Sequence, residues 1–489
     1  MMKRYGMCVV LFSLTVSVVQ GEDVSDGFWP RRSSVATRPA PVVNSVPSEK
    51  VSSVDEPVLL AEPPQNTTEN QERDATIRSL AERLEVLESR QKTLEVPPLA
   101  VLQADAKGYA LKSSDGNFLM KIKGDIHADG RFYLGDDGHR LMDQFLLRRV
   151  RPALDVLLSG KFHGRIQLNL ITSAPTQLDD AYFEWLTSPL CSLRFGRFKP
   201  EVGLENLQPS GVLSFIERSL ASNLVPVYDT GAGVYGVLGN GRLPYSLTYG
   251  NGAVDGGTGD TETTDRKEVN GRLFVLPFKR GSRDFLKDLG VGLGASRGGG
   301  EGASCLPARY NSQGMNQFFV YNGNTVANGT RTRWSPQFYW YPGPVSVMAE
   351  YVASAQKVKT TAGAKDNLTH RAWQVSASWV LTGDKTSFDG VKIKQNFDPK
   401  AGTWGVWEIA GRYSQLTVDN DAFAFFADPF LSARMSRAWT GGLNWYLNPA
   451  FKFQTNYSYN SFDGGAGTVQ DQQDRKTERS LFTRVVFAF

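Results

Sequence analysis

The chain is poor in the residues that build metal centres and disulfide scaffolds. Its 489 residues include three cysteines and four histidines, and none of them forms a pair with the spacing of a zinc site. Cys8 lies in the N-terminal apolar run, while Cys191 and Cys305 fall in connections that the topology below assigns to opposite sides of a membrane. We therefore expect no disulfide, no metal and no other cofactor.

Long apolar runs and a strong net charge are missing as well. Beyond the first 21 residues, no segment approaches the roughly 18 apolar residues that a spanning helix needs. The formal charge of +4 is no basic excess of the kind that binds nucleic acid. A helical membrane protein and a nucleic-acid partner are therefore excluded, and the direction in which the charges point matters more than their sum.

The first 21 residues have the pattern of an export signal. Lys3 and Arg4 precede an apolar run from residue 7 to residue 19, and the small residue Gly21 ends the segment. A positively charged start, an apolar centre and a small residue at the end are typical of a secretory signal peptide. We expect a signal peptide over 1–21 and a mature chain that begins at Glu22.

Two further segments precede the main domain. Residues 22–73 are rich in proline, serine, valine and glutamate without a sustained period, which predicts a disordered linker. Residues 74–96 carry apolar or neutral side chains three and four apart, at Ile77, Leu80, Leu84, Leu87, Gln91 and Leu94. This heptad spacing predicts a short coiled coil, either a stalk that holds a trimer together or a lone amphipathic helix.

From about residue 108 to the C-terminus the pattern has a period of two. Trp373, Val375 and Trp379 alternate with polar residues, and residues 451–459 alternate aromatic with polar side chains in the same way. A soluble β-sandwich could produce the alternation, but aromatic residues at both ends of the apolar face favour a transmembrane barrel. We predict an all-β fold, a transmembrane antiparallel β-barrel over 108–489.

The connections between the strands support this topology. Short turns are expected around residues 159–161, 187–189, 239–241, 341–344 and 447–449, and long polar loops at 134–142, 199–230, 251–267, 298–330, 356–369, 417–434 and 462–478. Short periplasmic turns that alternate with long outer loops are typical of outer-membrane barrels. Counting strands between these connections gives about sixteen.

The inward faces of these strands are rich in arginine. If aromatic and aliphatic residues face lipid, the alternation places these cations in the lumen: Lys121, Arg131, Arg149, Arg151, Arg165, Arg194, Arg272, Arg333, Arg412 and Arg484. Arginine keeps its charge and binds oxyanions through a rigid fork, and rings of arginine or lysine select anions in pores. Alternatively, these cations form salt bridges with inward acids such as Asp155, Glu350 and Glu408. For the cluster as a whole, we expect a pore that prefers small anions.

Several ordered motifs resemble one family, the phosphate-selective porins O and P. The resemblance covers 108–489. It depends on the segments 115–118, 147–152, 178–182, 193–199, 203–205, 216–220, 381–383, 407–413 and 443–446. It implies a sixteen-stranded trimeric porin of the Gram-negative outer membrane, surrounded by lipid, with its tail in the periplasm.

The resemblance also implies where the channel narrows. The third loop, 199–230, would fold inward and form the constriction with Phe215, Glu217 and Arg218, while Arg149 and Arg272 line the path and Asp179 lies nearby. Two departures from the family are notable. Asp125 replaces an arginine of the phosphate-specific members, and Gly211 replaces a lysine of their third loop. Small anions such as phosphate are the expected solutes, without an expectation of phosphate specificity.

Two other functions are compatible with a barrel. An outer-membrane enzyme would use a Ser–His pair, but His127, His139, His163 and His370 have no nucleophile motif beside them, so we expect no enzyme. A structural or adhesive barrel could tether the envelope through residues 22–95 without conducting ions. Ion current across a bilayer distinguishes this alternative from a porin.

Overall fold

The structure is a computed structural model that describes residues 67–94, 100–105, 108–135, 141–171, 176–259, 265–467 and 474–489. The expected signal peptide and most of the expected linker lie outside these ranges. Helix α1 (Thr67–Leu94) begins before residue 74, where the heptad pattern starts. In the described ranges, no helix is both long and apolar enough to cross a bilayer.

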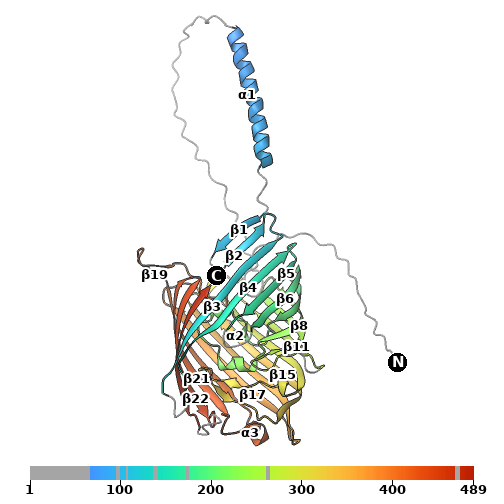
Figure 1. Ribbon diagram of the computed structural model, residues 1–489, viewed down its shortest axis with the longest axis vertical. Helices are drawn as coiled ribbons and strands as arrows, with labels where there is room; N and C mark the ends of the chain where they lie inside the picture. The colour runs from blue at the N-terminus through green and yellow to red at the C-terminus, as the bar shows by residue number, and fades with distance from the viewer. Residues whose placement is uncertain are drawn as a thin grey trace, which may run out of the picture.

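The main domain is a closed antiparallel barrel of sixteen strands (Figure 1). In order around the wall they are β3 (Leu119–Tyr133), β4 (Gln144–Leu158), β5 (Phe162–Asn169), β6 (Gln177–Ser188), β7 (Cys191–Phe198), β8 (Tyr228–Leu238), β9 (Leu243–Gly250), β11 (Glu268–Val275), β12 (Leu289–Gly302), β15 (Thr325–Trp340), β16 (Val345–Thr360), β17 (Lys365–Val380), β20 (Val406–Thr417), β21 (Met435–Asn448), β22 (Phe451–Asp463) and β23 (Thr477–Ala488). The last strand returns to the first, from the pair Ser480–Tyr133 to the pair Ala488–Asp125, and closes the barrel. The predicted fold class is confirmed.

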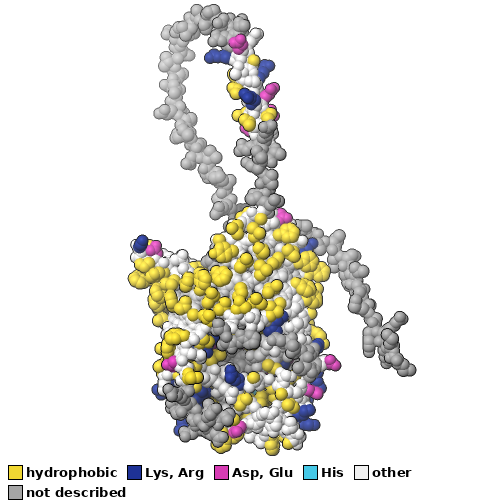
Figure 2. Space-filling model, in the orientation of Figure 1, with side chains coloured by type: hydrophobic (Ala, Val, Ile, Leu, Met, Phe, Trp, Pro, Cys, Tyr) yellow, Lys and Arg dark blue, Asp and Glu magenta, His cyan; other side chains and the backbone are white. Residues whose placement is uncertain are grey.

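The wall has an apolar outer face. Trp373 and Trp379 are 36% and 52% exposed, while Gln374 between them is buried. The same alternation holds in β22, where Phe453 is exposed and Gln454 is buried. Figure 2 shows the resulting apolar band across the visible face of the barrel. A sheet whose rings point outward and whose amides point inward suits a bilayer, because lipid covers the rings.

The expected short turns all join neighbouring strands at one end of the barrel, but two connections differ from the prediction. The predicted loop 356–369 is wrong, because β16 and β17 run through it and are joined by residues 361–364. Lys357 and Lys365 face outward on these strand ends, beyond the apolar band, so the polar sequence looked like a loop. At the end with the short turns, residues 381–405 form an unexpectedly long connection with β18 (Phe397–Asp398) and β19 (Thr403–Trp404).

Loops fill much of the outer half of the barrel with an apolar core. The third loop supplies Leu220 and Leu224, the segment between β12 and β15 supplies Phe318 and Phe319, and all four side chains are fully buried. They pack on inward-facing apolar residues of β16, β17 and β20, which are Val352, Val358, Leu368, Ala372 and Leu416. This part of the barrel interior is therefore packed with protein side chains.

A small hairpin extends the wall where the chain enters it. Strand β1 (Ala100–Asp105) pairs with β2 (Gly108–Ser113), and β2 pairs with the first residues of β3. The C-terminal residue Phe489 exchanges backbone hydrogen bonds with Gly124 of β3, at 2.7 and 2.9 Å. Gly108 has φ of +111°, and a Cβ there would collide with the carbonyl oxygen of Ile122. Along the same edge of β3, β2 pairs with residues 119–122, and the C-terminal strand β23 pairs with residues 125–133.

Candidate channel constriction

The third loop, residues 199–227, runs from β7 to β8 through the inside of the barrel. It carries α2 (Leu204–Leu207), η1 (Ser210–Val212) and η2 (Leu220–Leu224). The backbone N–H groups of Leu204 and Glu205 donate to the carboxylate of Glu350 on β16, at 2.7 and 3.2 Å. These bonds tie the start of the loop to the wall far from the strands that the loop connects.

Glu217 at the middle of the third loop is held by three arginines of the wall. Its Oε1 lies 2.8 Å from Nε of Arg148, 3.0 Å from Arg131 and 3.1 Å from Arg484. Burial alone would raise the pKa of Glu217, but Arg148 and Arg484 hold it well below its usual range. Charge-assisted bonds in a buried setting are strong, so Glu217 fixes the loop against β3, β4 and β23.

Further contacts attach the same face of the loop to β20, β21 and β22. Arg412 forms an ion pair of 2.8 Å with Glu205, and its guanidinium lies 4.3 Å from the ring centre of Phe215. Lys452 donates to the carbonyl oxygen of Leu213 at 2.9 Å. The third loop therefore lies against this side of the wall, and its Lys199 lies near Asp179 and Asp180 of β6 on the other side.

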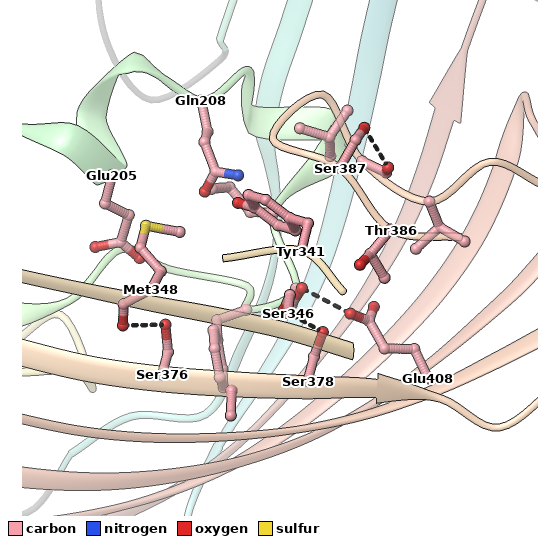
Figure 3. Close-up of a pocket in the computed structure, with 17 residues that line it drawn as sticks. Glu205, Gln208, Tyr341, Ser346, Met348, Ser376, Ser378, Thr386, Ser387 and Glu408 are labelled. Atoms are coloured by element: carbon pink, nitrogen blue, oxygen red, sulfur yellow. Dashed lines mark hydrogen bonds between the residues drawn. The ribbon is translucent and has the colours of Figure 1, made fainter. Parts of the chain in front are cut away.

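A small, partly open cavity lies behind the loop, between it and β16, β17 and β20 (Figure 3). Hydroxyl groups line it, and Ser346 and Ser378 hydrogen-bond one another across it at 2.7 Å. The connection 381–405 covers the cavity from the periplasmic side, since Gln208 of the third loop donates to the carbonyl oxygen of Phe388 at 2.9 Å. The third loop, which comes from the outer end of the barrel, thus meets the connection 381–405, which comes from the periplasmic end, inside the barrel.

Two β-bulges bring neighbouring charged residues into the lumen together. In β4, Arg149 pairs with His127 and Leu147 with Ala128, so Arg148 is the extra residue. In β6, Asp180 pairs with Gln167 and Leu178 with Leu168, so Asp179 is the extra residue. A bulge breaks the period of two and re-aims a side chain. Alternation alone therefore misses the inward direction of Arg148 and Asp179.

Several of the predicted lumen arginines are paired with carboxylates. Arg333 is fully buried and lies 2.6 Å from Asp255 and 2.8 Å from Glu268. Arg484 lies 2.6 Å from Asp129, and Arg131 lies 3.2 Å from the same carboxylate. These guanidinium groups hold loops and strands together, as in the salt-bridge alternative.

Three other predicted arginines have mixed surroundings. Arg165 bridges Asp155 and Asp180 at 3.2 and 3.1 Å. Arg194 lies 3.0 Å from Glu184, with its guanidinium 4.3 Å from the ring centre of Tyr182 and 4.2 Å from that of Tyr235. Arg272 donates to Gln337 at 2.7 Å and lies 3.9 Å from Glu201. Lys121 faces inward near the periplasmic end, in register with Asp155.

Four cations remain around the free face of the third loop, and we call them the constriction cations: Arg149, Arg151, Lys199 and Arg218. Arg149 is 5% exposed, and its Nε and Nη1 have no hydrogen-bond partner in the described part of the chain. Arg151 lies 2.9 Å from Asp179 and donates to Ser210 at 3.0 Å. The positive charges of Arg149 and Arg151 thus both act on Asp179, the extra residue of the β6 bulge.

Within the described ranges, the hydrogen bonds of the other two constriction cations go to backbone oxygens. Arg218 donates to the carbonyl oxygens of Glu205 and Gln208, at 3.2 and 2.7 Å. Lys199 donates to that of Asn206 at 3.0 Å. Burial lowers the pKa of Lys199 well below its usual range, and the nearby charges of Arg218 and Arg151 lower it further. Basic side chains thus lie close together at this place.

Comparison with known proteins identifies the family. The model of the phosphate-selective porin O and P family matches residues 120–489. The chain belongs to this family. It is 24% identical over 383 residues to Porin O of Pseudomonas aeruginosa, covering 72% of this chain and 84% of the relative. The porin is a channel of the Gram-negative outer membrane.

A solved structure supports the fold of the porin. The outer membrane channel DcaP of Acinetobacter baumannii is similar with a TM-score of 0.51 at 8% identity, over 77% of this chain and 99% of that one. An anion-selective porin from Comamonas acidovorans is similar with a TM-score of 0.47 at 10% identity, over 76% of this chain and 100% of that one.

The two departures from the family pattern meet at the tip of the third loop. Ser210, next to Gly211, lies 3.3 Å from Oδ2 of Asp125 through its hydroxyl oxygen. The same carboxylate lies 2.7 Å from Nε2 of His127. A Cβ at Gly211 would meet no atom within 4 Å, so this position borders open space. The tip of the third loop therefore lies beside the carboxylate of Asp125 and has glycine at position 211, where the expected pattern has an arginine and a lysine.

Proposed function

We propose that the porin is a water-filled diffusion channel that prefers anions, with its narrowest part between the third loop and strands β4 to β7. The observation that carries the proposal is Arg149, a buried guanidinium whose Nε and Nη1 have no partner among the described residues. An unpaired buried charge is costly unless an ion compensates it. A passing anion can supply that compensation.

The balance of positive and negative charges around the third loop also supports a preference for anions. Asp179 faces Arg151, and Asp180 is engaged by Arg165 outside the constriction cations. The four constriction cations therefore exceed the carboxylates that they contact. Anions would exchange part of their hydration for guanidinium contacts and pass between weak sites, since conduction requires binding that does not become trapping.

Small anions such as phosphate are the proposed solutes. The family description and the similarity to Porin O support phosphate among them. Asp125 adds negative charge beside the third loop, and Gly211 offers no cation. We therefore propose a general anion pore with weak phosphate binding, rather than a dedicated phosphate site.

We further propose that the porin is a homotrimer and that helix α1 belongs to a trimeric coiled coil in the periplasm. Ile77, Leu80, Leu84 and Leu87 are all at least 57% exposed in the single chain. A heptad seam that is exposed in one chain becomes buried when helices associate. The proposed export signal 1–21 and the chain up to residue 66 would lead into this helix.

Planar-bilayer recording tests the proposed pore. In a chloride gradient the reversal potential should indicate anion preference, and Arg149→Gln should move it toward cation permeation. Selectivity should also fall with added salt, because the Debye length falls from ~10 Å at 0.1 M to ~3 Å at 1 M. Arg242→Gln removes an exposed arginine from a periplasmic turn and should leave the potential unchanged. Equal potentials for the wild type and Arg149→Gln would refute the role of Arg149.

A further inference from the structure

The outer end of the lipid-facing wall has a continuous row of aromatic rings on β17, β20 and β21. The ring centres of Trp373 and Tyr413 are 5.0 Å apart, and those of Tyr413 and Trp439 are 4.6 Å apart. Trp439 is 63% exposed. Such rings prefer the boundary between lipid headgroups and hydrocarbon, so this row marks the outer boundary of the apolar band.

A hollow lies on the hydrocarbon side of this row. Its floor is Gly411 and Gly441, which are paired in register, and a Cβ on either residue would meet no atom within 4 Å. Val375, Ala377 and Tyr457 form its walls. We call this hollow the glycine groove. It is apolar and open to the bilayer, which suits an acyl chain.

On the water side of the rings lie three exposed arginines, Arg371, Arg437 and Arg479, which we call the arginine row. Arg371 and Arg437 precede Trp373 and Trp439 by two residues on the same outward faces. The guanidinium of Arg479 lies 5.9 Å from the ring centre of Tyr459. Among the described residues, no ion pair joins these arginines to a carboxylate, although Asp463 also faces outward in register with Met435.

Cations, rings and groove follow one another from the outer loops toward the middle of the bilayer. A phosphorylated lipid has its parts in the same order, with phosphate, interface and acyl chain. We propose that this face is a binding site for a phosphorylated glycolipid of the outer leaflet, with phosphates on the arginine row and an acyl chain in the glycine groove. The site lies on the outside of the wall and is independent of the proposed anion path.

The spacing of the arginine row favours a headgroup with phosphates at both ends. Arg371 on β17 and Arg437 on β21 are separated by one intervening strand, as are Arg437 and Arg479 on β23. Neighbouring strands are about 4.8 Å apart, so successive arginines start about 10 Å from one another. A disaccharide that carries a phosphate on each sugar spans a comparable width, whereas a single-phosphate headgroup reaches one arginine.

Native mass spectrometry of the full-length porin in detergent tests this site, with diphosphoryl lipid A as the probe. Each Arg→Gln change in the arginine row should weaken binding about fivefold, and the triple variant on the order of 100-fold. Gly441→Leu should fill the groove and also weaken binding, about tenfold for the lost chain contact. Conductance should stay at the wild-type value in all these variants, which shows that they fold.

Two matched variants serve as controls. Arg297→Gln removes another exposed outward arginine, and Gly164→Leu adds a side chain at another outward glycine with open space around it. Both should bind the probe as the wild type does. Unchanged binding by the triple arginine variant would overturn the proposal. Equal binding of phosphatidylethanolamine, weakened only by Gly441→Leu, would also overturn it and indicate a plain acyl-chain groove.

Discussion

Glu217 of the third loop lies 2.8 Å from Nε of Arg148, the extra residue of the bulge in β4. Without the bulge, the alternation in β4 would turn Arg148 toward lipid. The irregularity in the strand therefore creates the contact that places the third loop, and the loop in turn sets the position of the proposed constriction.

Removing the charge of Glu217 should loosen this loop. Glu217→Gln leaves the guanidinium groups of Arg131, Arg148 and Arg484 without their shared carboxylate, which should cost about 3 kcal/mol of stability. Thermal unfolding should occur at a lower temperature, and single-channel current should become noisier. Glu301→Gln, at a half-exposed ion pair with Arg266, should change neither, and a similar effect of both variants would contradict the anchoring role.

Restoring a cation at the tip of the loop should tighten phosphate binding. Gly211 has open space around its Cβ position and no left-handed φ, so Gly211→Lys is compatible with the fold. Combined with Asp125→Asn, it should lower the phosphate concentration that blocks chloride current by about tenfold. Gly323→Lys adds the same charge on an exposed outer loop and should leave the block unchanged. If the double variant behaves like this control, the solutes do not pass the tip.

Anion preference should depend on pH through Glu201. Burial raises the pKa of this carboxyl to about 7, although Arg272 and a 2.8 Å hydrogen bond from Ser246 favour its ionised form. An acid with a raised pKa is neutral below that value, so moving from about pH 6 to about pH 8 adds negative charge at the base of the third loop. The reversal potential should shift toward cation permeation over this range, and the shift should shrink in Glu201→Gln. An identical shift in both proteins would exclude Glu201 as its source.

The helix seam should stabilise the proposed trimer. Leu84→Asp places a charge in the seam and should lower the temperature at which trimers dissociate, measured by light scattering of the heated porin. Val86→Asp makes a comparable change on an exposed position outside the seam, and it should leave this temperature unaltered. Equal dissociation temperatures for Leu84→Asp and the wild type would argue against a coiled coil.

The sequence predicts the outward face of the wall well and its interior less well. Trp373 and Trp379 face outward as their alternation indicates, because a strand in a bilayer has one apolar side. Arg333 shows the limit of this reasoning. Alternation turns it inward correctly, but its partner Asp255 comes from the loop between β9 and β11, and no local pattern says that this loop folds into the barrel. Which arginines stay unpaired depends on such loop contacts, so Arg149 stands out only in the folded chain.

The end of the chain has a practical consequence for anyone who labels or purifies this porin. Gly108 lies against the backbone of Phe489, and β2 occupies the stretch of β3 that a longer last strand would need. An affinity tag fused after the final residue would have to displace the hairpin or bend sharply away from it. A tag on an outer loop avoids that conflict and leaves the terminal phenylalanine where the barrel closes.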